Sequence, residues 1–238
     1  MFDFKRALHT GDKVAIGVIV LSFIAGLLFY SSLPDQIASH WNLDGLPNGF
    51  MPTQLFVIGF PLLMLLSYLA MSKISTAKEL RYEMELLHRE YAGFKASIAT
   101  FLAYIYIIIL YSNSEFAPLH VSTSQLLLPG VSVLLYYLAT VLPRLKRNHL
   151  VGIRTPWTIH SDEAWHKTHV LGGKLFKALS VLVMFATLTA STISTGLVVI
   201  PILAVGVILV VYSYTIATNA HGKLSVKGKL SGKESNKK

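Results

Sequence analysis

The sequence predicts an all-α integral membrane protein with six transmembrane helices and with both termini in the cytoplasm. Six apolar runs approach or reach the roughly 20 residues that a helix needs to cross a bilayer. Charged residues make up only 14% of the 238-residue chain, whereas a soluble domain carries about 25%. The Lys and Arg residues gather in alternate connections between the apolar runs, which is the pattern of a protein that threads a membrane repeatedly.

The six transmembrane helices are expected at residues 14–33, 55–72, 96–112, 125–142, 174–191 and 198–217. Pro34 ends the first of them, because a proline ring clashes with the preceding helical turn. Pro61 lies inside the second, where neighbouring helices can satisfy the carbonyl that it frees. No small-residue cleavage site follows the first run, so we interpret it as a retained helix and not as a signal peptide.

The basic residues predict the orientation. Residues 1–13 hold three Lys or Arg, 73–95 hold five, 143–177 hold seven and 223–238 hold six, which accounts for all 21. The positive-inside rule places these segments in the cytoplasm and the loop 34–54 outside. Five or seven spans would break this segregation. The expected location is therefore the plasma (inner, cytoplasmic) membrane, with multiple passes.

The chain divides into three regions. These are an N-terminal two-span domain (1–95) with an outward loop (34–54) and a cytoplasmic helical arm (73–95), a four-span domain (96–220) with a cytoplasmic loop (143–173), and a disordered basic tail (221–238). The arm carries an apolar stripe at helical spacing, formed by Leu80, Met84, Leu87 and Tyr91. We expect this stripe to pack on a neighbouring helix and not to recruit a partner.

Composition excludes several functional classes. The net charge of +9 falls at helix ends, so we expect membrane lipids as partners and no direct contact with nucleic acid. There are no cysteines, which excludes disulfides and thiol chemistry. None of the six predicted spans has an Asp, Glu, Lys or Arg near its middle, which counts against an ion-coupled transporter.

A polar and aromatic passage, residues 148–173, interrupts this apolar chain, and we call it the central stretch. It contains four of the nine histidines and two of the three tryptophans. Pro156 disfavours a helical conformation at Thr155 and so predicts a loop. Ser161 is suited to begin a helix. That helix is expected to run to Leu171 and to end at the two glycines that follow it.

Three histidines of the central stretch, His160, His166 and His169, lie near two acidic residues, Asp162 and Glu163. A step of three residues on a helix can bring His166 and His169 close to one metal ion. The spacing lacks the His-Glu-x-x-His pattern of zinc proteases, so these histidines are weak metal candidates. General acid–base chemistry is a second use for them.

Arg154 has two interpretations. Its guanidinium can hold a lipid phosphate or a carboxylate in a bidentate manner. Alternatively it is a headgroup anchor or braces the loop through a salt bridge to Asp162 or Glu163.

The outer loop 34–54 contains a second polar and aromatic group, formed by Asp35, His40, Trp41 and Asn42. These residues could form a polar lid with an aromatic contact surface. The alternative is that Trp41 belongs to the aromatic belt at the membrane interface and that the polar residues serve turns.

The order of uncommon residue types in the central stretch resembles the SdpI/YfhL family of membrane proteins. The residues that carry the resemblance and would form the functional surface are Asn148, Gly152, Arg154, Thr155, Pro156, Trp157, Trp165, Thr168 and His169. The first half of the chain resembles a small two-span domain of unknown function. Its matching residues are Pro34, Asp35, Ile37, His40, Trp41, Asn42, Gly45, Asn48 and Gly49, and Asn48 stands where that domain often has Asp.

The resemblance implies a membrane immunity or sensor protein without enzymatic activity or cofactor. Such a protein gives resistance to a secreted peptide toxin or bacteriocin, and it signals by holding a cytoplasmic transcriptional repressor at the membrane. The toxin and the repressor would then be partners. Two alternatives stay open: a metal-dependent membrane enzyme that uses the cytoplasmic His, Asp and Glu residues, and a transporter of small molecules or lipids.

Overall fold

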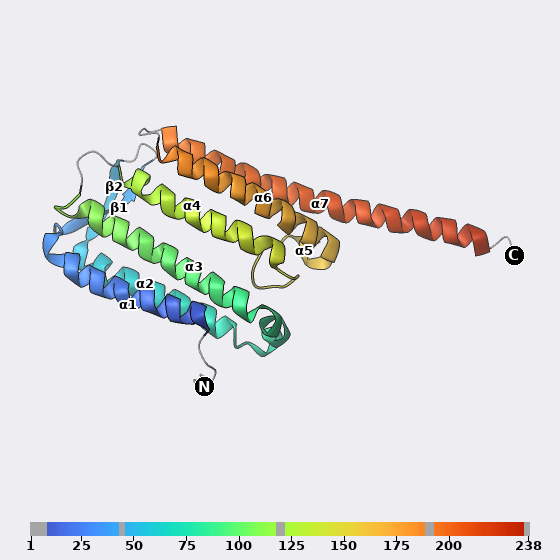
Figure 1. Cartoon of the computed structure of the whole chain (residues 1–238), viewed down its shortest axis with the longest axis horizontal. Coiled ribbons are helices and arrows are strands. Elements are labelled where there is room, and N and C mark those ends of the chain that lie inside the picture. The colour runs from blue at the N-terminus through green and yellow to red at the C-terminus, as the bar shows by residue number, and fades with distance from the viewer. Residues whose placement is uncertain (1–8, 43–45, 118–121, 189–192, 236–238) are drawn as a thin grey trace.

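A computed structural model describes residues 9–42, 46–117, 122–188 and 193–235. Within these ranges, six helices are long and apolar enough to cross a membrane, as predicted. They are α1 (Thr10–Phe29, extended by η1, Tyr30–Ser32), α2 (Thr53–Ile74), α3 (Arg81–Asn113), α4 (Thr123–Val141), α6 (Asp162–Ala186) and α7 (Ile193–Ser235). They lie side by side with their axes roughly parallel (Figure 1).

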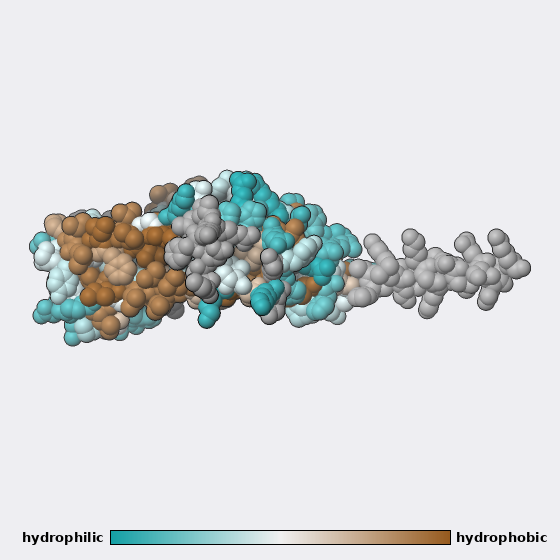
Figure 2. Space-filling model, turned by 90° about the horizontal axis from the view of Figure 1, so that it is seen from below, coloured by the Kyte–Doolittle hydropathy of each residue, from teal (hydrophilic) through white to brown (hydrophobic). Residues whose placement is uncertain are grey.

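The bundle has two distinct ends. One end, which we call the hairpin end, carries the strands β1 (Gln36–Trp41) and β2 (Pro47–Pro52). The opposite end, which we call the basic end, carries the short elements η2 (Lys78–Leu80), η3 (Leu142–Arg144) and α5 (Pro156–His160). On the face that Figure 2 shows, hydrophobic residues form a broad patch, and hydrophilic residues prevail toward the basic end. Large apolar side chains such as Leu28 on α1 and Ile58 on α2 are exposed, as expected for helices that face lipid.

The antiparallel hairpin β1–β2 differs from the irregular loop expected for residues 34–54, so the fold is mostly helical with one small sheet. Ile37 pairs with Met51 across the sheet, and the Ile37 side chain is buried against α2 and α3. The Asn113 side chain, at the end of α3, accepts a hydrogen bond from the Ala38 amide (2.8 Å) and donates to its carbonyl (3.2 Å). Helix α3 therefore anchors the hairpin.

Helices α1, α2 and α3 form one packing unit around Tyr106, which is fully buried. The Tyr106 hydroxyl donates to the Val57 carbonyl of α2 at 2.8 Å. Its ring stacks on Phe56 and Phe60 with centroid distances of 5.4 and 5.5 Å. A buried aromatic ring with its hydroxyl satisfied joins two helices through both apolar and polar contact.

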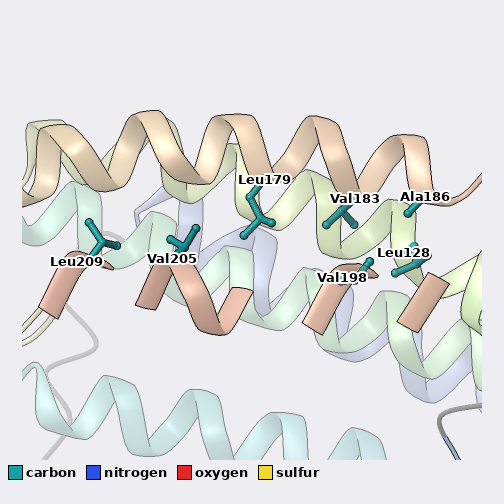
Figure 3. Packing of buried hydrophobic residues seen from close by; sticks show 7 residues of the cluster. All are labelled: Leu128, Leu179, Val183, Ala186, Val198, Val205 and Leu209. Atoms are coloured by element: carbon teal, nitrogen blue, oxygen red, sulfur yellow. The ribbon is translucent and has the colours of Figure 1, made fainter. Parts of the chain in front are cut away.

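Helices α4, α6 and α7 form a second packing unit. Its buried core consists of Leu128, Leu179, Val183, Ala186, Val198, Val205 and Leu209 (Figure 3). The Ser132 hydroxyl of α4 donates to the Ser180 carbonyl of α6 at 2.8 Å, inside this unit. Hydroxyl groups in membrane helices commonly make such interhelical bonds.

Helix α6 is continuous from Asp162 to Ala186, so the prediction that Gly172 and Gly173 end a shorter helix is wrong. The two glycines instead permit close packing. A Cβ on Gly173 would meet the Ala139 carbonyl oxygen at 2.9 Å and Pro143 at 2.7 Å. Small residues at an interface let two helices approach in this way.

Residues 81–95 of the arm are nearly the first half of α3, so most of the arm is an extended end of that helix. Leu87 and Tyr91 of its apolar stripe are buried, and Leu87 packs with Leu142, Leu145 and Trp165. The Tyr91 hydroxyl donates to the Met71 carbonyl at 2.9 Å. The stripe therefore packs within the bundle, as predicted.

An ion pair lies inside the bundle, between residues just outside the predicted spans 14–33 and 96–112. Asp12 of α1 and Lys95 of α3 are both buried, and their charged groups are 2.5 Å apart. The Tyr68 hydroxyl donates to the Asp12 carboxylate (3.1 Å), and Lys95 donates to the Ser72 hydroxyl (3.2 Å). The pair lies within α1 and α3 because these helices begin at Thr10 and Arg81, ahead of the predicted spans, and the prediction that the middle of each span lacks a charge is not contradicted.

Helix α7 continues to Ser235, whereas residues 221–238 were predicted to be disordered. The extension has a physical basis: adding residues to a helix that already exists requires no new nucleus. The Lys residues of this segment are good helix formers, although its glycines are not.

Candidate functional site at the basic end

The central stretch, residues 148–173, forms a loop, the short helix α5 and the first turns of α6, all at the basic end (Figure 1). The Ser161 hydroxyl accepts a hydrogen bond from the Ala164 amide at 3.2 Å, so Ser161 begins α6 as predicted. Trp165, one turn into α6, is buried. Its indole N–H donates to the Leu145 carbonyl at 2.7 Å, which fixes the chain that leaves α4.

His169 is buried and stacks on Trp165, with ring centroids 4.1 Å apart. Its Nδ1 lies 2.8 Å from the Trp165 carbonyl oxygen, and Nδ1 must donate because a carbonyl only accepts. Its Nε2 accepts a hydrogen bond from the Ile153 amide at 2.9 Å. The imidazole in this arrangement is therefore neutral with its proton on Nδ1, and its one lone pair is already used.

Gly152 completes the contact between the loop and α6. Its backbone angle φ is +127°, a value that residues other than glycine rarely adopt. A Cβ at this position would lie 2.5 Å from Nε2 of His169 and 3.1 Å from the Trp165 ring. The site therefore requires glycine for two separate reasons.

Asn148 organises the same loop from its other side. Its side-chain oxygen accepts from the amides of Leu150 and Val151, both at 2.8 Å. Its side-chain amide donates to the carbonyls of Lys146 (2.8 Å) and Val151 (3.0 Å). Because Asn148 is buried and satisfied at both ends, its role in this structure is to hold the loop.

Thr155 begins helix α5, with Pro156 in the first turn. The Thr155 hydroxyl accepts from the Thr158 amide (3.1 Å), and the Thr158 hydroxyl accepts from the Thr155 amide (2.8 Å). Thr155 also contacts the Ser213 hydroxyl of α7 at 2.9 Å. Trp157 meets Tyr214 of α7 edge to face, with centroids 5.1 Å apart. Helix α5 is thereby joined to α7.

Arg154 is the exposed charge of the loop. Its Nη1 donates to the His149 carbonyl at 2.5 Å. The salt bridge considered from the sequence is not formed: Asp162 pairs with Arg147 and Glu163 with Lys167, both at 2.6 Å. The guanidinium therefore keeps N–H donors beyond the one that bonds to His149.

The loop is also attached to α3. Glu83 accepts from the His149 amide at 2.8 Å and lies 2.6 Å from its Nδ1. Sequence reasoning missed Glu83, Ser213 and the role of Thr158. Glu83 and His149 are 66 positions apart, so no local pattern relates them.

Thr168 differs from its neighbours. It is fully buried, and its hydroxyl has no hydrogen-bond partner within the part of the chain that the structure describes. Its side chain thus contributes to packing alone.

The histidines considered as metal ligands do not converge. His160 and His166 are exposed, and His160 donates from Nδ1 to the Pro156 carbonyl at 2.6 Å. His169 is buried, and both of its ring nitrogens already form hydrogen bonds. Among the residues described, no group of three or more His, Asp or Glu side chains is placed to hold a metal ion. The structure therefore gives the metal-dependent alternative no assembled site.

The outer-loop residues lie at the hairpin end, away from the central stretch. His40 contacts Asn48 across the hairpin at 2.6 Å, and the Asn42 side chain accepts from the Leu46 amide at 2.9 Å. Trp41 is half-buried and packs against the core of the first unit. Asp35 is exposed, and its backbone carbonyl accepts from the Thr53 amide at 3.0 Å.

These features define a multi-pass helical membrane protein with a tightly bonded loop assembly at one end and a small hairpin at the other. Comparison with known proteins agrees with the resemblance seen in the sequence. Residues 144–214 match the SdpI/YfhL protein family, and residues 17–65 match a domain of unknown function, DUF1648. The chain thus contains a region that matches the SdpI/YfhL family and, ahead of it, a region that matches DUF1648.

The chain is also similar to a curated protein, Immunity protein SdpI of Bacillus subtilis (strain 168). The two are 27% identical over 205 residues, which cover 86% of this chain and 92% of that protein. No solved structure matches.

Proposed function

We propose that this protein is a membrane immunity and sensor protein that gives resistance to a secreted peptide toxin or bacteriocin. The observation that carries the proposal is its similarity to an immunity protein along 86% of the chain. The structure adds that Asn148, Gly152, Thr155, Trp165 and His169 meet in one bonded assembly. Arg154 is the charged group that this assembly exposes.

The proposed orientation places the basic end in the cytoplasm and the hairpin outside, because Lys and Arg concentrate on the cytoplasmic side of membrane proteins. A secreted peptide would then meet the hairpin first. Phe50 and Leu46 are exposed there, and Asp35 and His40 are exposed beside them. These residues would supply apolar and polar contacts to a peptide.

The chain lacks cysteine, so single cysteines can report the orientation. Leu46→Cys on the hairpin should react with a membrane-impermeant maleimide on intact cells. Lys146→Cys, which is exposed at the basic end, should react only after the membrane is opened. The reverse labelling pattern would overturn the orientation.

At the basic end, we propose that the surface around Arg154 and Trp157 signals toxin binding by holding a transcriptional repressor at the membrane. Arg154 is exposed, and Trp157 is partly exposed between α5 and α7. Exposed arginine and tryptophan are the residue types that dominate protein interfaces. The bonded loop beneath them would keep both side chains in a fixed arrangement.

The test is survival of toxin-sensitive bacteria that express the chain. The wild-type protein should protect against a peptide toxin, and Arg154→Ala and Trp157→Ala should reduce protection or repressor recruitment at equal membrane abundance. Lys174→Ala, an exposed cation elsewhere on α6, is the matched control and should behave as wild type. Protection no better than empty vector across a panel of peptide toxins would remove the immunity proposal.

A further inference from the structure

A groove opens at the basic end between α3, α4 and the loop of the central stretch, with a volume of about 260 Å³. Its walls are mostly apolar and include Phe94, Leu138, Val141 and Phe176. Two charged residues also line it: Glu90 of α3 and Arg154 of the loop. A groove of this composition fits a ligand with an apolar body and a charged head.

The two charged residues are available to a ligand. In the described parts of the chain, neither Glu90 nor Arg154 takes part in an ion pair. The other acidic residues near the loop are occupied: Glu83 with His149, Asp162 with Arg147 and Glu163 with Lys167. Arg154 donates to the His149 carbonyl through Nη1, which leaves further N–H donors on the guanidinium.

The groove lies where a span meets the headgroup region. On α4 it extends from Val141, the last residue of the helix, back to Tyr137, a distance of about 6 Å along the axis. On α3, Glu90 follows Leu87 by one turn, and Leu87 packs against Leu142. Ile153, next to Arg154, lies near Leu142 as well, because both approach Gly172. The segments that carry the acid and the guanidinium therefore meet around Leu142, and both residues line the groove.

We propose that this groove binds one phospholipid with a zwitterionic ethanolamine headgroup. The phosphate accepts hydrogen bonds from the Arg154 guanidinium, and the primary ammonium donates to the Glu90 carboxylate. The upper part of an acyl chain lies along Phe94 and Leu138. This site does not depend on the immunity function.

The charges select among lipid classes. A choline headgroup has no N–H to donate to Glu90, so it loses that bond. An anionic glycerol headgroup brings a phosphate to Arg154 but offers no cation, which leaves Glu90 unpaired beside the negative charge. Only a headgroup that carries both a phosphate and a primary ammonium satisfies both residues.

The experiment uses the purified full-length chain and native mass spectrometry with ethanolamine, choline and glycerol phospholipids of identical acyl chains. The wild-type protein should retain the ethanolamine lipid about tenfold better than the choline lipid, as one charge-assisted hydrogen bond implies. Glu90→Gln should remove this preference, and Arg154→Ala should weaken retention of all three lipids. Lys146→Ala and Glu85→Gln, exposed residues of the same segments that do not line the groove, are matched controls.

Arg154→Ala also removes the bond to His149, so a second variant separates binding from folding. Arg154→Lys keeps the charge and should keep measurable retention of the ethanolamine lipid. Equal retention of the three lipids by the wild type, preference for the glycerol lipid, or an unchanged preference in Glu90→Gln would each overturn the proposal. Survival under toxin is measured separately, so failure of either proposal is distinguishable from failure of the other.

Discussion

Gly152 in the loop and His169 on α6 are in direct contact, and a Cβ on Gly152 would fall 2.5 Å from Nε2 of the imidazole. That nitrogen accepts from the next amide of the loop, the amide of Ile153, at 2.9 Å. One histidine on a helix thus fixes both the conformation and the position of the loop that carries Arg154.

Gly152→Ala should destabilise the protein by about 2–4 kcal/mol, because it combines a steric clash with a strained backbone at φ +127°. Thermal unfolding in detergent measures the effect. Gly206→Ala is the control, since nothing lies within 4 Å of a Cβ there. A Gly152→Ala protein as stable as Gly206→Ala would contradict the described contact.

The buried ion pair predicts strong coupling between α1 and α3. Asp12→Asn or Lys95→Met alone should cost about 3–5 kcal/mol, because each leaves a buried charge without its partner. The double variant should be more stable than the sum of the single losses predicts. A double-mutant cycle on unfolding free energies measures this, and purely additive losses would show that the two groups do not interact.

Two buried threonines should respond differently to valine. The Thr158 hydroxyl donates to the Ile153 carbonyl (2.8 Å) and accepts from the Thr155 amide (2.8 Å), so Thr158→Val should cost about 1–3 kcal/mol. Thr168→Val should be neutral or stabilising, because the buried Thr168 hydroxyl has no partner among the residues described. Unfolding midpoints of the two variants provide the comparison, and equal losses would be inconsistent with the structure.

The hydrogen bonds of His169 predict one tautomer. Selective ¹⁵N labelling of histidine should show His169 neutral, with its proton on Nδ1 and with Nε2 unprotonated. His166, which is exposed on the same helix, is the internal comparison. A proton found on Nε2 would exclude the bond from the Ile153 amide.

The transmembrane helices could be predicted from sequence because a bilayer imposes a minimum length of apolar chain. The ends of these helices could not be predicted in the same way. A hydropathy pattern leaves a charged residue such as Lys95 out of a span, whereas the fold includes it in α3 and buries it. The hairpin was not predicted because Asn48 and Gly49 form a typical turn dipeptide and were interpreted as part of a loop. In the structure both residues lie within strand β2. Its position depends on Asn113, which is 75 positions from Ala38.

In the central stretch, local rules predicted the loop before Pro156 and the start of α6 at Ser161. They could not predict that Glu83 bonds to His149 or that Thr155 meets Ser213, because these contacts depend on how the helices pack. The same holds for the exposed state of Arg154, whose possible acidic partners are taken by Arg147 and Lys167.

Helix α3 spans 33 residues, about 50 Å, without a break. One of its ends holds the Ala38 backbone through Asn113, and near the other end Glu83 holds His149. One continuous helix therefore connects the hairpin end of the bundle to the basic end. A tilt or a shift of α3 along its axis would move its contacts with Ala38 and His149 together, so a displacement at one end of the bundle would be transmitted to the other.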